Sequence, residues 1–287
     1  MTEGTRSILL RLGAVVTALL LTIPVFAACG VPPGAGWSAL FDGAFGSLAK
    51  FGYCLGSAAP LLLCAAGLLV TFAAGLWNIG VEGQIVLGAI GAFAVLRAPW
   101  AIDHPAAAQV AAPLAAMLAG GAWALAVAAL KVWGRVHEIF SGLALNFFAS
   151  GLTLHLIMGP WKRPGVASTG GAEPVAEGLW LPALPEWNLS AVELLLPVVA
   201  LIAAAVFLKG TQYGLRLKAL GLNAAAAERM GVPVRRELAV ALGVGGALAG
   251  LAGWLPIAGA SAPHTLQSNV SGGYGYGALL LALLAVR

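Results

Sequence analysis

Charge is the property that this sequence of 287 residues has least of. Asp, Glu, Lys and Arg make up 9% of it and hydrophobic residues 60%, whereas roughly a quarter of an ordinary soluble domain is charged. The net charge is only +4, and the basic residues stand at the ends of apolar runs rather than along one stripe. This pattern argues against a nucleic-acid-binding surface. The composition predicts a membrane protein and no nucleic acid as partner.

Cysteine and the common catalytic motifs are equally scarce. Cys29, Cys54 and Cys64 form no C-x-x-C pair and have no histidine at metal-ligand spacing, so we expect small buried side chains and no disulfide framework or zinc site. No lysine precedes Ser or Thr, which excludes the phosphate-binding G-x-x-x-x-G-K-[ST] loop, and neither H-E-x-x-H nor G-x-S-x-G occurs. We predict no catalytic residue, metal or cofactor on this chain, which by itself cannot use ATP.

Long apolar runs, in contrast, are abundant. They continue for about twenty residues, whereas the strands of a membrane β-barrel alternate over about ten. Gly (39 residues) and Pro (16 residues) are frequent, as packed membrane helices tolerate. We predict an all-α, polytopic transmembrane helical bundle of about eight spans, as a single domain over residues 1–287. The expected spans are Ile8–Cys29, Tyr53–Ala73, Ile85–Leu96, Ala106–Val132, Ile139–Met158, Val192–Leu208, Leu238–Ala260 and Ala278–Val286.

The basic residues between the runs predict the orientation, because Lys and Arg concentrate on the cytoplasmic side. With the N-terminus inside and strict alternation, ten Lys and Arg residues fall inside and four outside. Omitting the short run Ile85–Leu96 would reverse every later loop, so the asymmetry favours eight crossings over seven. The inner residues are Arg6, Arg11, Lys131, Arg135, Lys209, Arg216, Lys218, Arg229, Arg235 and Arg236, joined by Arg287 if the last run crosses; the outer ones are Lys50, Arg97, Lys162 and Arg163.

The first run has two interpretations. Ala27-Ala28-Cys29 resembles the processing site of a secretory signal. The run is longer than the usual signal core, and Phe26 is a poor residue three positions before a lipidated cysteine. We therefore predict an uncleaved first helix.

The inner segment 209–237 contains signals for a very short helix. Asn223 can accept a hydrogen bond from the first turn, Gly231 can take the left-handed closing conformation, and Pro233 bars continuation. A helix of about seven residues is marginal in water and needs packing partners. Its alanine surface fits a groove on another protein; the alternative is a connector lying on lipid headgroups.

Polar residues inside the apolar stretches are few. Asn78, Glu82 and Gln84 stand between two apolar runs, and Asn146 stands within another. Ionisable residues at membrane depth usually face a cavity or a partner and mark function. These four residues are our candidates for a substrate pathway. The alternatives are that Glu82 ends a helix at the inner surface and that Asn146 only bridges helices.

Two further segments carry packing or docking signals. Gly246, Gly250 and Gly253 lie in a run dense in small residues, which predicts closely packed helix backbones. The loop 159–190 is rich in Pro and Trp and is predicted to lie outside, either as a docking surface or at the level of the headgroups. The segment 271–277, SGGYGYG, fits a flexible aromatic rim of a pathway or an aromatic belt with glycine hinges.

These motifs together resemble the permease subunits of bacterial ABC importers of the branched-chain amino acid, ribose and nucleoside permease superfamily. GLWNIGVEGQ at 75–84 is similar to the G-L-F-N-I-G-x-E-G-Q signature of the nucleoside and simple-sugar branch. EIFSGLALN at 138–146 resembles its E-V-I-x-x-L-M-L-N segment. The segments 211–232, 246–253 and 273–277 continue the likeness in order, so that it covers most of the chain.

The resemblance implies a type II ABC importer-like fold and a set of partners. A second permease, identical or different, would complete the membrane domain. ATP-binding subunits, which hold ATP and Mg²⁺, would seat short cytoplasmic helices of the permeases, and an extracytoplasmic solute-binding protein would deliver nucleosides or simple sugars. The chain would lie in the bacterial cytoplasmic (inner) membrane, with 209–237 as its coupling loop. The coupling residues would be Gly221, Asn223, Ala226, Ala227, Glu228 and Gly231.

This sequence departs from the family pattern at its end, because family members usually continue with further membrane segments after the Gly-Tyr-Gly region. We therefore expect a chain that is truncated at its C-terminus. Two other classes remain open from the residues alone: an ATP-independent channel or carrier, and an inactive remnant.

Overall fold

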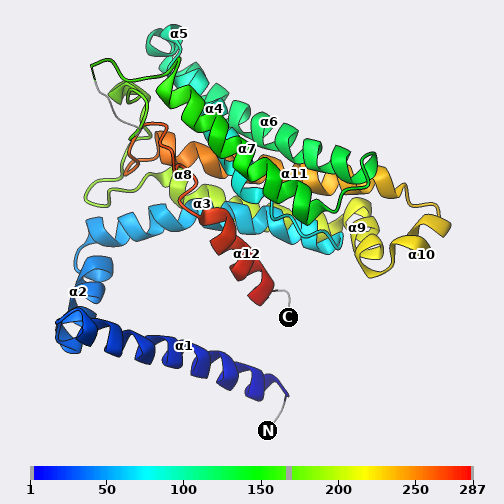
Figure 1. Ribbon diagram of the computed structural model, residues 1–287, viewed down its shortest axis with the longest axis horizontal. Coiled ribbons are helices and arrows are strands. Elements are labelled where there is room, and N and C mark those ends of the chain that lie inside the picture. The colour runs from blue at the N-terminus through cyan, green and yellow to red at the C-terminus, as the bar shows by residue number, and fades with distance from the viewer. Residues whose placement is uncertain (1–2, 166–169, 286–287) are drawn as a thin grey trace. The chain divides into compact units, whose positions relative to one another are not determined.

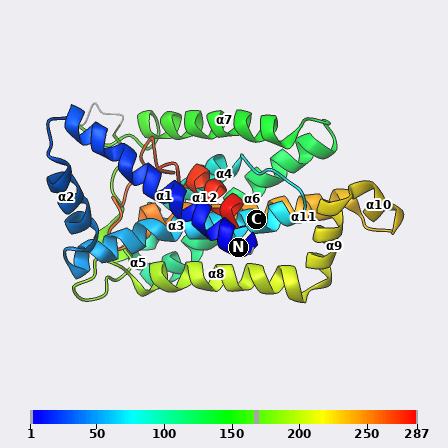
Figure 2. The same ribbon diagram turned by 90° about the horizontal axis from the view of Figure 1, so that it is seen from below.

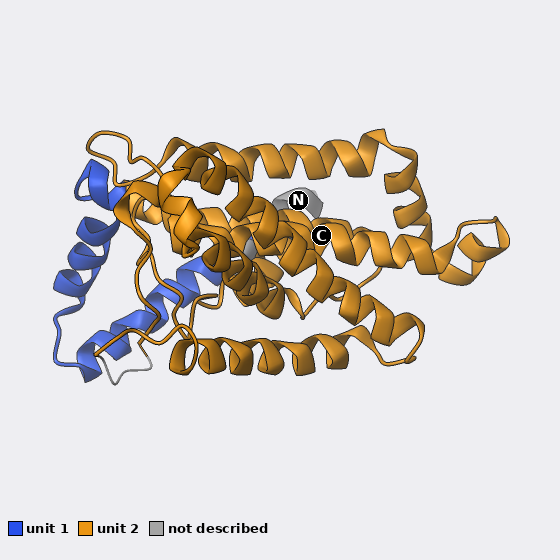
Figure 3. Cartoon of the chain, turned by 90° about the horizontal axis from the view of Figure 1, so that it is seen from above, with its two compact units in different colours: residues 1–51 blue, residues 52–287 orange. Residues whose placement is uncertain are grey.

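The computed structural model describes residues 3–165 and 170–285, and in these residues it consists of helices, one 3-10 turn and loops (Figure 1). The only strand-like pairings there are two isolated bridges. The predicted all-α fold is confirmed. The chain divides into two compact units, residues 1–51 and 52–287 (Figure 3), so that the single permease domain stays a prediction.

The first unit contains two helices joined by a sharp bend. Helix α1 (Glu3–Ala28) is followed by α2 (Pro33–Phe45), and their axes differ by 116°. Gly30 has φ 71°, a conformation that glycine adopts without strain. Pro33 occupies the first turn of α2, where its missing N–H costs nothing.

The second unit is built from long helices around a buried short one. Figure 2 shows α7 and α8 on opposite sides of the helices between them. The elements are α3 (Leu48–Ala73, which begins in the first unit), α4 (Val81–Leu96), α5 (Pro99–Asp103), α6 (Pro105–Val132), α7 (Glu138–Met158), η1 (Glu177–Leu179), α8 (Ala191–Gly210), α9 (Gln212–Leu222), α10 (Ala224–Arg229), α11 (Val234–Ala258) and α12 (Tyr274–Ala285).

Among the described residues, fewer helices than the eight predicted spans are long and apolar enough to cross a membrane. Five helices, α3, α6, α7, α8 and α11, are long and apolar enough to cross a membrane, and the bent pair α1–α2 would be a sixth. Helix α4 has only 16 residues, about 24 Å at the standard rise. The last predicted span ends at Val286, which lies outside the described residues together with Arg287.

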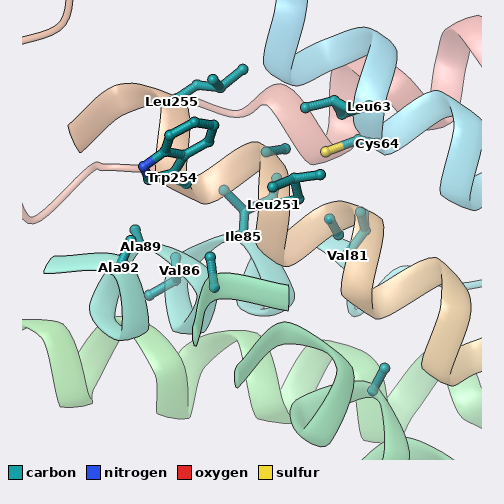
Figure 4. Close-up of a cluster of buried hydrophobic side chains, with 14 of the residues drawn as sticks. Leu63, Cys64, Val81, Ile85, Val86, Ala89, Ala92, Leu251, Trp254 and Leu255 are labelled. Atoms are coloured by element: carbon teal, nitrogen blue, oxygen red, sulfur yellow. The ribbon is translucent and has the colours of Figure 1, made fainter. Parts of the chain in front are cut away.

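The core forms where α4, α6 and α11 pack with their backbones in contact. Figure 4 shows side chains of α3, α4 and α11 together, among them Cys64, Ile85 and Trp254. A Cβ atom on Gly88 would collide with the backbone of Gly250, and one on Gly250 with the carbonyl oxygen of Ala116. The other predicted packing residues lie at similar places: a Cβ on Gly253 would collide with Ile85, and one on Gly246 with Ala124.

The expectation of buried cysteines is correct for one of the three. Cys64 lies in the core, whereas Cys29 and Cys54 are exposed. In a membrane protein an apolar side chain can face lipid instead of the core, because lipid tails are as apolar as a protein interior.

Backbone hydrogen bonds and a ring stack hold part of the long loop 159–190 against the segment that follows α11. The amides of Ala172 and Val175 donate hydrogen bonds to the carbonyl oxygens of Leu266 (2.9 Å) and His264 (2.8 Å). The Trp180 and His264 rings stack with centroids 3.7 Å apart. Burial lowers the pKa of His264, so the stacked imidazole is neutral at pH 7. Residues 172–180 therefore have a defined position against the segment that follows α11.

The backbone contact at Gly250 predicts a large effect of a bulky substitution. Gly250→Leu should destabilise the protein by about 1–3 kcal/mol or more, because its side chain has to displace the α6 backbone at Ala116 and Gly120. Thermal unfolding in detergent measures the change. Gly151→Leu on α7 is the control, since nothing lies within 4 Å of a Cβ at that position; equal melting temperatures for the two variants would contradict the contact.

Candidate functional site

The polar motif lies at the break between α3 and α4. Helix α3 ends at Ala73, and Gly75 takes φ 72° in the turn that follows. The side-chain amides of Asn78 and Gln84 bind each other: Asn78 Nδ2 donates to Gln84 Oε1 (3.0 Å), and Gln84 Nε2 donates to Asn78 Oδ1 (2.9 Å). Both side chains are buried. This reciprocal pair ties the turn to the first residues of α4.

Asn146 of α7 holds the same break from the other side. Its Nδ2 donates to the carbonyl oxygen of Ile79 (2.9 Å), and its Oδ1 accepts from the amide of Gly83 (2.8 Å). These two backbone groups belong to residues around the start of α4, where helical hydrogen bonds are missing. Gly142 of α7 lies against Gly80, since a Cβ on Gly142 would stand 2.7 Å from the Gly80 amide nitrogen. One side chain thus satisfies the opened backbone.

Glu82 connects this motif to the start of α12. Its Oε2 accepts a hydrogen bond from the amide of Gly275 (2.8 Å). The first amides of a helix have no partner within the helix, and Glu82 supplies one to α12, which begins at Tyr274. A Cβ on Gly275 would collide with Glu82 Oε2. The carboxyl group therefore fixes the position of α12.

The four predicted pathway residues thus come together at one buried place. Asn78, Glu82, Gln84 and Asn146 have at most 8% of their surface exposed, and each makes hydrogen bonds within the chain. Their arrangement joins the α3–α4 turn, α7 and α12. Their role as a pathway wall stays a prediction.

The short helix in the segment 209–237 begins and ends at the expected signals. Asn223 Oδ1 accepts from the amide of Ala226 (3.0 Å), and Gly231 has φ 84° just after α10. Ala226 and Glu228 are exposed, whereas Ala227 is fully buried. Large apolar side chains flank this surface, because Leu222 is 88% exposed and Met230 74% exposed. Figure 1 shows α10 at one extremity of the second unit.

The same segment touches the turn that leads into the polar motif. A Cβ on Gly221, in the last turn of α9, would collide with the carbonyl oxygen of Ala73. A Cβ on Gly75 would stand 3.1 Å from the Gly221 Cα atom. The end of α9 and the α3–α4 turn are therefore in direct backbone contact.

Several partners in these contacts were not among the predicted site residues, and two of them stand out: Gly275, which binds Glu82, and Gly75, which meets Gly221. Both belong to glycine-bearing motifs that are visible in the sequence. The sequence feature that could have identified them is a glycine that stands next to a residue whose polar groups need a backbone group as partner. No local pattern says which segment that partner comes from.

Removing the Glu82 carboxyl group should loosen the start of α12. Glu82→Ala leaves the amide of Gly275 without its acceptor, at a cost of about 1–3 kcal/mol. Hydrogen–deuterium exchange of residues 273–277 should become faster. The exposed residue Glu177 provides the control substitution, Glu177→Ala. Unchanged exchange at the start of α12 in Glu82→Ala would refute the role of Glu82 as a cap.

Comparison with known proteins assigns the chain to a family. The model of the family "Branched-chain amino acid transport system / permease component" matches residues 51–287. The guanosine ABC transporter permease protein NupP of Bacillus subtilis is 27% identical over 96% of this chain and 79% of its own length. The nucleoside ABC transporter permease protein NupB of Lactococcus lactis is 28% identical over 88% and 71%.

A third relative has a higher identity over a shorter part of the chain. The glucose ABC transporter permease protein TsgB13 of Haloferax volcanii is 31% identical over 79% of this chain and 61% of its own length. No solved structure matches the chain. Since the family model covers most of the sequence, including the polar motif and the segment of α9 and α10, the chain belongs to the family of permease components of the branched-chain amino acid transport system type.

Proposed function

We propose that this chain is the membrane permease subunit of an ATP-driven importer for nucleosides or related sugar-containing small molecules. The observation that carries the proposal is its membership in the permease family, together with relatives named for guanosine, nucleoside and glucose transport. Simple sugars and branched-chain amino acids are the alternative substrates, the first supported by the glucose relative and the second by the family description.

The segment 209–237 is the proposed contact with an ATP-binding subunit, in which ATP and Mg²⁺ bind. The exposed surface around α10 carries small alanines between Leu222 and Met230. Small side chains let a groove on another protein approach the backbone closely, and the two flanking side chains supply apolar area. Gly221, Asn223, Ala226, Ala227, Glu228 and Gly231 are the proposed coupling residues.

Closure of the ATP-binding subunits would then move the membrane helices through a short chain of contacts. Gly221 meets the α3–α4 turn at Ala73 and Gly75, and that turn leads to Asn78 and Glu82. Packed elements with two discrete arrangements can transmit such a displacement, because ligand binding changes their relative stability. The buried polar residues are proposed to link the turn to α12 during this movement and to border the pathway.

The remaining assignments follow from the same function. A second permease, identical or different, would complete the membrane domain. The pinned loop 159–190 would face a solute-binding protein, and the chain would lie in the bacterial cytoplasmic membrane with its N-terminus inside. An ATP-independent carrier, as the competing class, requires no ATP-binding partner.

A charged, bulky residue on α10 should separate these classes. Ala226→Arg places a long cation on the exposed face of α10, so the ATP-binding subunit should no longer copurify and ATP-driven uptake should fall at least tenfold. Ala106→Arg is the matched control, because Ala106 is an exposed alanine in the first turn of α6. If both variants keep ATP-driven uptake and unimpaired ATPase coupling, the proposed interface is refuted.

A further inference from the structure

A pocket lies among four elements of the second unit, at the end of the bundle opposite to α10. It is lined by residues of the first half of α3, the start of α8, the end of α11 with the segment that follows it, and the start of α12, and its volume is about 140 Å³. Figure 1 shows α12 beginning beside α3. A cavity of roughly 150 Å³ can hold one six-membered ring such as benzene. The pocket thus has room for a single ring.

The polar wall of the pocket is formed by Glu193, in the first turn of α8. Its side chain is only 4% exposed, and its Oε2 accepts hydrogen bonds from the amides of Ser190 (2.8 Å) and Ala260 (3.2 Å). The Ser190 Oγ in turn accepts from the Glu193 amide (3.0 Å). The carboxylate is therefore held in one orientation, with Oε2 turned toward the backbone.

The second carboxylate oxygen, Oε1, faces two glycines. A Cβ on Gly259 would collide with Oε1, and a Cβ on Gly56 would stand 3.7 Å from Oε1 and 3.4 Å from Ser261 Oγ. Gly56, Glu193 and Ser261 all line the pocket. Because Gly56 and Gly259 have no side chains, Glu193 Oε1 and the Ser261 hydroxyl face the same space. The pocket thus presents an acceptor beside a group that can donate or accept.

The chemistry of the wall selects a neutral ring that carries hydroxyl groups. Tyr53 and Tyr274 add aromatic rings and Ser57 a further hydroxyl, and such a mixture of apolar surface with a few placed polar groups is typical of small-molecule sites. Among the described residues that line the pocket, none is Lys or Arg, so a phosphate or carboxylate would lack a counter-charge next to Glu193. Carboxylates are suited to sugar hydroxyls, as in nucleotide sites where Asp or Glu binds the ribose.

We propose that this pocket binds the sugar ring of the transported molecule, with Glu193 Oε1 accepting hydrogen bonds from ring hydroxyls. The assignment rests on the function proposed above and adds a specific site to it. Gly210 lies 17 positions after Glu193 in α8, about 25 Å along the helix at the standard rise. In the predicted orientation the pocket is thus on the outer side, where a released substrate enters the membrane domain.

Two variants alter the pocket without removing its supports. A methyl group in Gly56→Ala makes ordinary van der Waals contacts with Ser261 and Glu193, so it fits the fold and takes up part of the space for the ring. In Glu193→Gln the amide oxygen can keep the bonds from Ser190 and Ala260, which turns the atom facing the pocket from an acceptor into a donor. Gly151→Ala, with nothing within 4 Å of the new Cβ, is the control for adding a methyl group to a membrane helix.

The direct test is saturation-transfer NMR on the purified permease with its ATP-binding subunit, with uridine as the probe. The ribose protons of uridine should receive saturation in wild type and Gly151→Ala. We expect at least a threefold weaker signal in Gly56→Ala. Glu193→Gln should bind uridine about tenfold more weakly, as expected when a hydrogen bond to a charged group is lost, and 2′,3′-dideoxyuridine should bind wild type more weakly than uridine does.

Other outcomes would overturn the assignment. Equal uridine signals in wild type, Gly56→Ala and Glu193→Gln would show that the sugar binds elsewhere, and no signal in wild type would show that this chain has no sugar site. Displacement of uridine by leucine, with dideoxyuridine binding as well as uridine, would point to an ammonium group at Glu193 instead. Uptake by reconstituted liposomes separates these results from the proposed function, which fails if wild type imports neither uridine nor glucose in the presence of ATP.

Discussion

The structure depends on satisfying the polar groups that the break between α3 and α4 leaves inside an apolar bundle. A membrane interior offers no water to an opened backbone, so irregular segments persist only where protein groups pair with them. Asn146 supplies both partners that Ile79 and Gly83 need, and Asn78 and Gln84 satisfy each other. Glu82 uses its carboxyl group to hold a helix that begins far away in the sequence. The polar residues of the motif are therefore the means by which the break is tolerated.

The break between α3 and α4 can transmit a movement only because close backbone contacts surround it. Gly88 and Gly250 bring α4 and α11 into backbone contact, and Gly221 brings the end of α9 against the turn before α4. Such contacts leave no flexible side chain to absorb a displacement, because a close-packed interior transmits strain. A push on α10 from a partner protein would therefore reach the α3–α4 turn through backbone atoms. The pocket beside Glu193 lies at the other end of the same helices.

The sequence predicts the features whose causes are local. Apolar runs give the positions of the helices, and Asn223 and Gly231 mark the limits of α10 because capping needs only neighbouring residues. The prediction of eight spans exceeds the number of helices that are long enough to cross a membrane. It rested on the distribution of Lys and Arg between the loops, which does not show that α4 has only 16 residues. The partner of Glu82 and the contact between Gly75 and Gly221 join segments distant in the chain. No periodic pattern in the sequence encodes such pairings. The environment of the Glu193 carboxylate likewise depends on glycines from distant segments, Gly56 and Gly259.

The bond between Glu82 and Gly275 also has a consequence for how the protein is made. The two residues are 193 positions apart, and ribosomes add about 5–20 residues each second. Glu82 therefore enters the membrane roughly 10–40 s before the amide that will bind it has been synthesised. During this interval its carboxyl group depends on water, on lipid headgroups or on the insertion machinery. The arrival of α12 is thus the step of biosynthesis that completes the polar motif, and ribosomal stalling before that point would leave an unpaired acid in the bilayer.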